Sequence, residues 1–292
     1  MMPMPHGLRV IDTHVNIPWS QHDAARYGAF RGLQRDRESL DSFKMPAQYM
    51  FRGIPDLGDD TSTYVARVLE AMDRHDVAVA LIPVGDAAAY PEIIRDHSDR
   101  FVFQAAVDPN KGMDEIRRIR ALHAEYRLSG LSYFAAGSMP QVAINGKEMY
   151  PFYALACELE LPFFLNVGVP GPRIPLATQK VELLDEICWF FPELTVVMRH
   201  GAEPWEDMAV KLMLKYPNLY YSTSAFAPRH YPKAIVDYAN TRGAGKIIYA
   251  GYFAAGLSLD RIFSELKDVP FKDEVWPKFL RENAAKVLKI PL

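Results

Sequence analysis

The 292-residue chain has few cysteines, no long apolar run and no excess of basic charge. Its two cysteines, Cys157 and Cys188, lie inside apolar helical patterns, which indicates core packing in a reducing compartment rather than a disulfide scaffold. No apolar run approaches the roughly 18 residues of a membrane-spanning helix. The 33 basic and 36 acidic residues give a net charge of −3 without a strongly basic window. Nucleic-acid and membrane-surface binders need clustered cations, so both classes are disfavoured.

What the chain does have is the composition of an ordinary globular protein, 49% hydrophobic and 24% charged. The opening residues, MMPMPHGLRV, lack the charged end and apolar core of a signal peptide. We therefore expect a cytoplasmic protein.

Short apolar, β-branched runs alternate with amphipathic helical patterns, and from the second run onward they start 24 to 33 residues apart. Strands that are apolar on both faces and alternate with helices indicate a parallel sheet. Eight such units predict a closed (β/α)₈ TIM barrel of class α/β, with residues 1–292 forming one domain. A doubly wound sheet would need a glycine-rich phosphate turn after an early strand, and none is present. The predicted strands are residues 8–16, 77–84, 101–108, 128–135, 161–168, 194–201, 219–227 and 246–253.

An insertion, residues 17–59, separates the first strand from its helix and is rich in aromatic and arginine residues. We expect it to lie over the face where the strands end, as a lid or substrate wall, or as a dimer contact. The tail, residues 273–290, reads as an amphipathic helix that seals the barrel.

Polar side chains follow the predicted strands at the face where this fold places its chemistry. Strand alternation predicts that Asp12, His14 and Asn16 point to one side. His200 ends the sixth strand, and its pairing with His14 predicts a functional centre, because buried polar groups need a partner or a purpose. The other polar side chains at strand ends are Ser132, Tyr133, Asn166, Ser222, Thr223, Ser224 and Tyr252.

These residues resemble the amidohydrolase superfamily, in particular the amidohydrolase-related branch with aminocarboxymuconate-semialdehyde decarboxylase, resorcylate-type decarboxylases and pyrone-dicarboxylate lactonase. The resemblance extends from VIDTHVN to NAAKVL. It rests on IDTH in the first strand, RHGAEPW after the sixth, LYYSTSAF in the seventh, and YAGYF followed by LSLDRI at the eighth. It implies a TIM-barrel hydrolase or carbon–carbon lyase that works as a homodimer.

The chain departs from the metal-binding pattern of that family. The first-strand His-x-His is His14-Val-Asn16 here, the fifth-strand His is matched by Asn166, and the eighth-strand Asp is matched by Tyr252, while His200 is retained. Two imidazoles and two amide oxygens are a poor zinc set, and harder ions prefer carboxylates, which are absent at the matched positions. The lactonase gives a precedent for catalysis without metal. We favour a metal-free site, with Zn, Mn or Fe left open as cofactors.

The first interpretation is therefore a hydrolase of an activated acyl bond, or a decarboxylase, acting on a small cyclic, aromatic or carboxylated substrate. His200 is the predicted general base, since imidazole titrates near neutral pH. His14, Asn16 and Asn166 would donate hydrogen bonds to an oxyanion, and Tyr252 would serve as a neutral acid or hydrogen-bond donor.

Five further residues form the predicted substrate contacts. Arg173 and Arg229, in loops after the fifth and seventh strands, are suited to clamp a carboxylate. Trp19 and Tyr133 would line an apolar pocket, and Glu203 lies just beyond the sixth strand.

Two other interpretations stay open. A metal-dependent enzyme with displaced ligands, capable of non-haem iron oxygen chemistry, would draw on His14, His200, His22, Glu203 and His230. A barrel without catalytic activity would bind a small molecule or a partner. Metal analysis separates the metal-dependent enzyme from the metal-free hydrolase or decarboxylase. Ligand-induced stabilisation without turnover would favour the barrel without catalytic activity.

Overall fold

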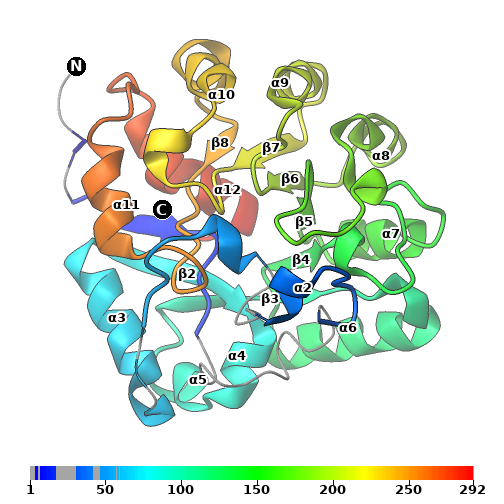
Figure 1. Cartoon of the computed structure of the whole chain (residues 1–292), viewed down its shortest axis with the longest axis horizontal. Helices are drawn as coiled ribbons and strands as arrows, with labels where there is room; N and C mark the ends of the chain where they lie inside the picture. The colour runs from blue at the N-terminus through cyan, green and yellow to red at the C-terminus, as the bar shows by residue number, and fades with distance from the viewer. Residues whose placement is uncertain are drawn as a thin grey trace.

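The computed structural model describes residues 4–5, 7–17, 31–41, 47–56, 58 and 60–291. Eight strands form one sheet in the order β1 to β8, and every neighbouring pair is parallel, which confirms the predicted (β/α)₈ fold (Figure 1). The strands are β1 (Val10–Asp12), β2 (Val77–Pro83), β3 (Phe101–Ala106), β4 (Gly130–Tyr133), β5 (Phe163–Asn166), β6 (Val196–Arg199), β7 (Leu219–Ser222) and β8 (Ile247–Ile248).

The first and last strands meet beyond their regular ends. Val15 and Phe253 form an isolated parallel bridge, and the Asn16 N–H donates to the Phe253 carbonyl at 2.7 Å. Thr13 N–H donates to the Tyr249 carbonyl at 3.4 Å. Strands β1 and β8 are at the two edges of the sheet, and the segments that follow them close the barrel by these contacts.

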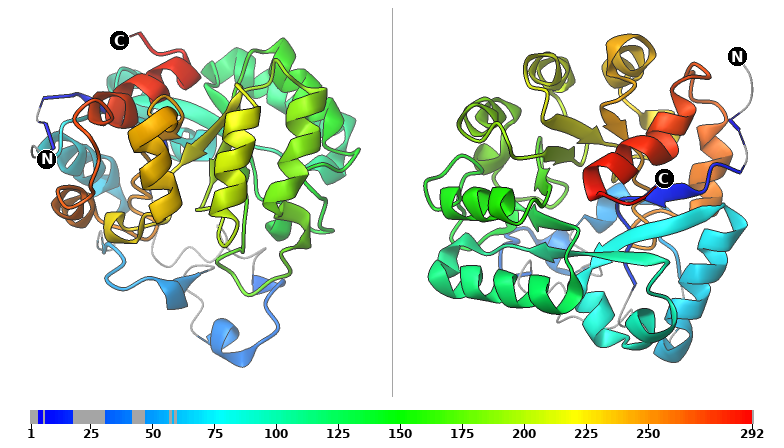
Figure 2. Two further views of the ribbon diagram at one scale, coloured as in Figure 1. Left: turned by 90° about the horizontal axis from the view of Figure 1, so that it is seen from above. Right: turned by 180° about the vertical axis from the view of Figure 1, so that it is seen from behind.

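Helices follow the strands and surround the sheet (Figures 1 and 2). Helix α6 coincides with one of the amphipathic helical patterns of the sequence, residues 113–126: acidic residues occupy its first turn and Arg127 adopts the left-handed conformation typical of a C-terminal cap. The α-helices are α2 (Arg37–Asp41), α3 (Tyr64–Arg74), α4 (Val84–Ala89), α5 (Glu92–Asp96), α6 (Met113–Tyr126), α7 (Tyr150–Glu158), α8 (Leu184–Phe190), α9 (Glu206–Lys215), α10 (Lys233–Tyr238), α11 (Leu259–Leu266) and α12 (Asn283–Leu288).

Shorter helical turns join these elements. Two are π-helical: η8 (Ala239–Gly243) continues α10, and η9 (Lys278–Glu282) leads into α12. The 3-10 turns are η1 (Gln48–Met50), η2 (Thr61–Thr63), η3 (Pro109–Lys111), η4 (Ala135–Gly137), η5 (Ala177–Gln179), η6 (Val181–Leu183) and η7 (Pro228–His230).

Strand residues divide by alternation between two buried clusters. One cluster packs the strands against the surrounding helices, and the other fills the barrel. Helix α12 crosses one end of the barrel and contributes to the inner cluster, as the tail of the sequence predicts (Figure 2). The inner strand residues are Ile11, Leu81, Phe164, Val197, Tyr220 and Ile248. Because side chains alternate, Arg199, two positions after Val197, also faces inward.

The described part of the insertion lies at the end of the barrel opposite α12 (Figure 2). It contacts the loop after β5, where the Tyr49 hydroxyl donates to the Gly171 carbonyl at 2.7 Å. A lid role for residues 17–59 stays a prediction. None of the helices in the described part of the chain combines the length and apolarity that a membrane crossing requires.

Gly168, in the turn after β5, has φ +92, and a Cβ there would lie 2.8 Å from backbone atoms of Ala202 and Glu203. We expect Gly168→Ala to lower the free energy of unfolding by about 2 kcal/mol or more, because positive φ and a backbone clash add together. Urea unfolding measures this loss. Gly245→Ala is the matched control, since a Cβ there meets nothing within 4 Å. Equal stability of the two variants would contradict the expectation.

Candidate functional site

The end of β1 sets the position of the first histidine. The strand stops at Asp12, whose Oδ1 accepts hydrogen bonds from the backbone N–H groups of His14 and Gly251, both at 2.9 Å. Asp12 is fully buried beside Tyr249, whereas His14 is half-buried. The regular strand ends at Asp12, before His14, and the common direction expected for Asp12, His14 and Asn16 stays a prediction.

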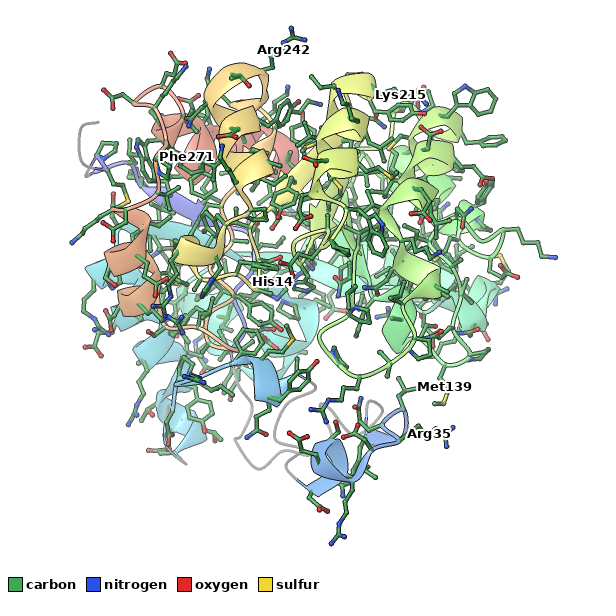
Figure 3. The ribbon with its side chains drawn as sticks, turned by 45° about the horizontal axis from the view of Figure 1, so that its top comes forward. His14, Arg35, Met139, Lys215, Arg242 and Phe271 are labelled. Carbon is green, nitrogen blue, oxygen red and sulfur yellow. The ribbon has the colours of Figure 1, made fainter. Side chains whose placement is uncertain are left out.

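Three rings from three strand ends converge at the barrel mouth. The ring centroids of His14 and His200 are 5.4 Å apart, those of His14 and Tyr252 are 4.9 Å apart, and those of His200 and Tyr252 are 5.4 Å apart. Phe51 of the insertion stacks on Tyr252 at 5.5 Å. Figure 3 shows His14 toward the middle of the molecule, away from the outer helices. The structure thus brings together the three residues predicted to be catalytic, and their role stays a prediction.

The backbone at two of these residues is strained. His200 has φ 63 and Tyr252 has φ 55, a left-handed conformation that costs non-glycine residues about 1–3 kcal/mol each. Hydrogen bonds hold both segments: Ser224 Oγ accepts from His200 N–H at 3.1 Å, and Gly251, next to Tyr252, donates to Asp12. Such strain is typical of segments that orient functional side chains.

His200 is a neutral imidazole at physiological pH. Burial and the neighbouring Arg199 guanidinium lower its pKa to about 3. Ser224 Oγ lies 3.2 Å from Nδ1 of the ring. Burial, reinforced by the positive charge of Arg199, thus opposes protonation of the ring in the site without substrate, and the role of His200 as general base stays a prediction.

Arg199 is the functional candidate that sequence analysis missed. Its side chain is 3% exposed, and the guanidinium lies 4.4 Å from the centroid of the Phe164 ring. Nη2 donates to Gln104 Oε1 at 2.7 Å and to the Thr13 carbonyl at 3.3 Å. Burial lowers its pKa to about 9, so the group is still charged at neutral pH. A charged residue at an inward position of an apolar strand was the signal that could have found it.

Asp12 is a second buried ionisable group. Burial raises its pKa to about 7, against the opposing effect of its hydrogen bonds from Gly251 and His14. A Cβ at residue 251 would lie 2.5 Å from Asp12 Oδ2, so glycine at that position makes room for the carboxyl group. Asp12 fixes the backbone of His14 rather than its ring.

The two asparagines stand at the ends of their strands. Asn16 and Asn166 are half-buried, and Asn166 pairs with Arg199 in the β5–β6 register. The backbone of Asn16 joins the segment after β8. Two further predicted residues, Trp19 and His22, lie outside the described residues.

The two arginines of the predicted carboxylate clamp each pair with carboxylates of this chain, and the clamp itself stays a prediction. Arg173 donates to Asp36 at 2.6 Å and to Glu38 at 3.1 Å, so it ties the loop after β5 to the insertion. Arg229 is exposed and pairs with Glu265 at 3.3 Å. Both guanidinium groups are satisfied by carboxylates that are distant in sequence, which local patterns do not reveal.

Two more predicted substrate contacts have other surroundings. Tyr133 is 3% exposed, and its hydroxyl donates to the Val142 carbonyl at 2.8 Å, so it braces a loop. Glu203 is exposed, and its backbone carbonyl accepts from Val169 N–H at 2.8 Å. We do not retain either as a substrate contact.

The donor set does not fit the metal of the resembled family. The described residues contain no group of three or more His, Cys, Asp or Glu side chains placed to hold a metal ion. Two imidazoles converge, but Arg199 adds positive charge beside them, which disfavours a divalent cation. The displaced set is not assembled either as far as the described residues show, since His230 and Glu203 are exposed.

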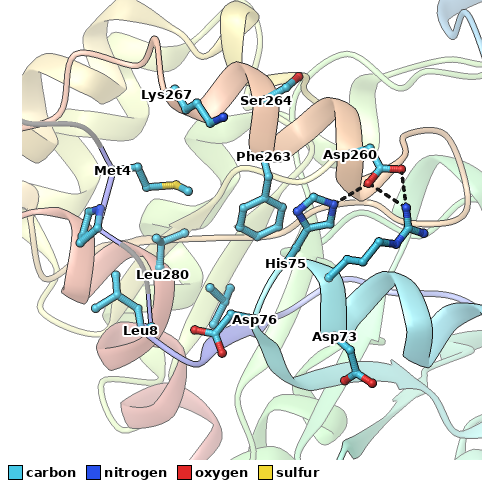
Figure 4. A pocket seen from close by; sticks show the side chains of 14 residues that line it. Met4, Leu8, Asp73, His75, Asp76, Asp260, Phe263, Ser264, Lys267 and Leu280 are labelled. Carbon is cyan, nitrogen blue, oxygen red and sulfur yellow. Dashed lines mark hydrogen bonds and ion pairs between the residues drawn. The ribbon is translucent and has the colours of Figure 1, made fainter.

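A pocket of about 480 Å³ lies elsewhere, between the start of β1, the end of α3 and helix α11 (Figure 4). There His75 Nε2 is 2.6 Å from Asp260 Oδ1, Arg74 donates to the same carboxylate, and Phe263 stacks on the His75 ring at 4.8 Å. The polar side chains of this pocket pair with one another. They lie at the face where the strands begin, which in TIM barrels contributes to stability and not to catalysis.

The sequence model of the amidohydrolase family matches residues 11–290, and the chain belongs to this family. It is therefore an enzyme of the amidohydrolase type. A search of curated proteins finds no match.

Solved structures share the fold. An uncharacterized TIM-barrel protein from Bordetella bronchiseptica superposes with a TM-score of 0.69 at 17% identity, covering 96% of this chain and 98% of that one. The 2,6-dihydroxybenzoate decarboxylase from Rhizobium superposes with a TM-score of 0.63 at 14% identity, covering 96% of this chain and 98% of that one. The 4-oxalomesaconate hydratase from Rhodopseudomonas palustris superposes with a TM-score of 0.61 at 13% identity, covering 96% of each chain.

The raised pKa of Asp12 makes a prediction about stability and pH. Between the unfolded pKa of 3.8 and the folded pKa of about 7, the folded protein keeps a proton that the unfolded chain has lost. Stability is therefore lost as pH rises through this window, and Asp12→Asn removes the loss. We expect the free energy of unfolding of Asp12→Asn, relative to that of the wild type, to rise by more than about 1 kcal/mol when the pH is raised from about 5 to about 8. Urea unfolding at each pH measures this difference. Asp99→Asn, at an exposed carboxyl group, is the control. A constant difference between Asp12→Asn and the wild type would contradict the raised pKa.

Proposed function

We propose that this protein hydrolyses an activated acyl bond, such as an ester or a lactone, in a small carboxylated substrate, without a bound metal. The observation that supports this most is the convergence of His14, His200 and Tyr252 at the barrel mouth. Neutral hydrogen-bonding groups that meet at one point are suited to bind the oxyanion of an acyl-transfer reaction.

His200 is the group that removes the proton from water. Nδ1 of His200 donates its proton to Ser224 Oγ, which is 3.2 Å away. In this tautomer Nε2 carries the lone pair that accepts a proton. Water loses a proton to Nε2 as its oxygen bonds to the acyl carbon. The proton then passes to the leaving oxygen as the acyl bond breaks, so the products are a carboxylic acid and an alcohol or enol.

The low pKa of His200 belongs to the site without substrate. As the acyl oxygen gains negative charge, that charge favours protonation of the nearby imidazole, so the base becomes stronger while the reaction proceeds. His14, Asn16 and Asn166 are the donors available to the oxyanion, and the Tyr252 ring lies beside both imidazoles.

The buried charge favours hydrolysis over decarboxylation. Arg199 stabilises negative charge near the site, and hydrolysis places new negative charge on an oxygen. Loss of CO₂ instead moves the negative charge of a carboxylate onto the carbon that is left behind, so a cation beside that carboxylate stabilises the reactant more than the transition state.

His200→Asn tests the base. With 4-nitrophenyl hemisuccinate, an activated ester that carries a carboxylate, we expect kcat/KM to fall by about 10² or more, since a positioned base contributes about that factor. His230→Asn, at an exposed histidine in η7, is the control and should retain the wild-type rate.

Two results would contradict the proposal. Ester hydrolysis that is equal in the wild type and His200→Asn would remove His200 from the reaction. Release of CO₂ from 2,6-dihydroxybenzoate, dependent on His200, would assign decarboxylation instead.

A further inference from the structure

We propose that Arg199 is an anion-binding residue at the base of this site and that it binds the carboxylate of the substrate. This inference deepens the proposed function, since it assigns the charged group of the substrate to a residue. It rests on the position, the burial and the partners of one guanidinium.

Arg199 is held firmly from three sides. Gln104 of β3 and the Thr13 carbonyl after β1 both accept hydrogen bonds from Nη2, and the ring of Phe164 on β5 supports the face of the guanidinium at 4.4 Å. These elements lie on different sides of the barrel. A side chain fixed in this way has lost its rotamer freedom before any ligand arrives, which lowers the entropy cost of binding.

The positive charge of Arg199 has no counter-charge. No carboxylate in the described part of the chain forms an ion pair with it, and its closest side-chain partner, Gln104, is neutral. Nε is fully buried without an acceptor among the described residues, and Nη1 donates to none of them. A buried cation is costly unless it is paired, so an arriving anion would recover interactions that the folded protein leaves unmade.

Arg199 also lies next to the ring cluster. It is the residue before His200, it contacts the carbonyl of the residue before His14, and its charge interacts with Tyr252. An anion bound by Arg199 would therefore lie close to the three rings. Guanidinium donors match the planar oxygens of a carboxylate, which identifies the ligand class as a small monocarboxylate.

Benzoate and benzamide form a matched pair of probes, because they have similar shape and differ in charge. We expect the wild-type protein to bind benzoate at least about 10-fold more tightly than benzamide, as charge-assisted hydrogen bonds predict. Isothermal titration measures both affinities at equal ionic strength.

Gln104→Glu is the decisive variant, because it keeps the shape of the side chain and places a carboxylate 2.7 Å from Nη2. We expect the benzoate preference to fall to about 1-fold in this variant and in Arg199→Met, and to persist in Arg199→Lys. Arg242→Gln, at an exposed arginine in η8, is the control and should keep the preference.

If Arg199→Met does not fold, Gln104→Glu and the Nε–Hε nuclear magnetic resonance signal of Arg199 in the wild type provide the answer. An unchanged benzoate preference in Gln104→Glu, or an Nε–Hε signal that benzoate does not shift, would overturn the proposal. Benzoate binding without ester hydrolysis would leave Arg199 as the anion site and reject only the proposed reaction.

Discussion

A positive charge inside an apolar barrel is the constraint on which this site depends. Arg199 extends inward from β6 among residues such as Phe164 and Val197, and only neutral groups accept its hydrogen bonds. Burial together with the field of Arg199 keeps His200 neutral, and the same field disfavours a metal ion beside it.

The backbone of the mouth is organised by the carboxyl group of Asp12. One oxygen of Asp12 holds the N–H groups of His14 and Gly251, and so it connects the turn after β1 to the segment after β8. The same segments carry the bridge between Val15 and Phe253 that joins the two ends of the sheet. Barrel closure and the placement of His14 and Tyr252 are thus one structural feature.

The repeating pattern of the sequence predicted the fold because each β-α unit buries its own apolar faces. All eight strands and the limits of α6 follow from local periodicity. The site was harder to predict, since its geometry depends on the end of β1 at Asp12 and on ion pairs such as Arg173 with Asp36, which are far apart in sequence. Arg199 carried a signal in the sequence, a charge within an apolar strand, but its partners Gln104 and Thr13 are far away in sequence and become visible only in the folded barrel.

The central claim is that His14, His200 and Arg199 form a site that works without a metal ion. Its most direct test is elemental analysis of protein purified without chelators, repeated on the double variant His14→Ala, His200→Ala. The account predicts that zinc, manganese and iron are far below one equivalent in both proteins. Near-stoichiometric metal in the wild type that is lost in the double variant would contradict it.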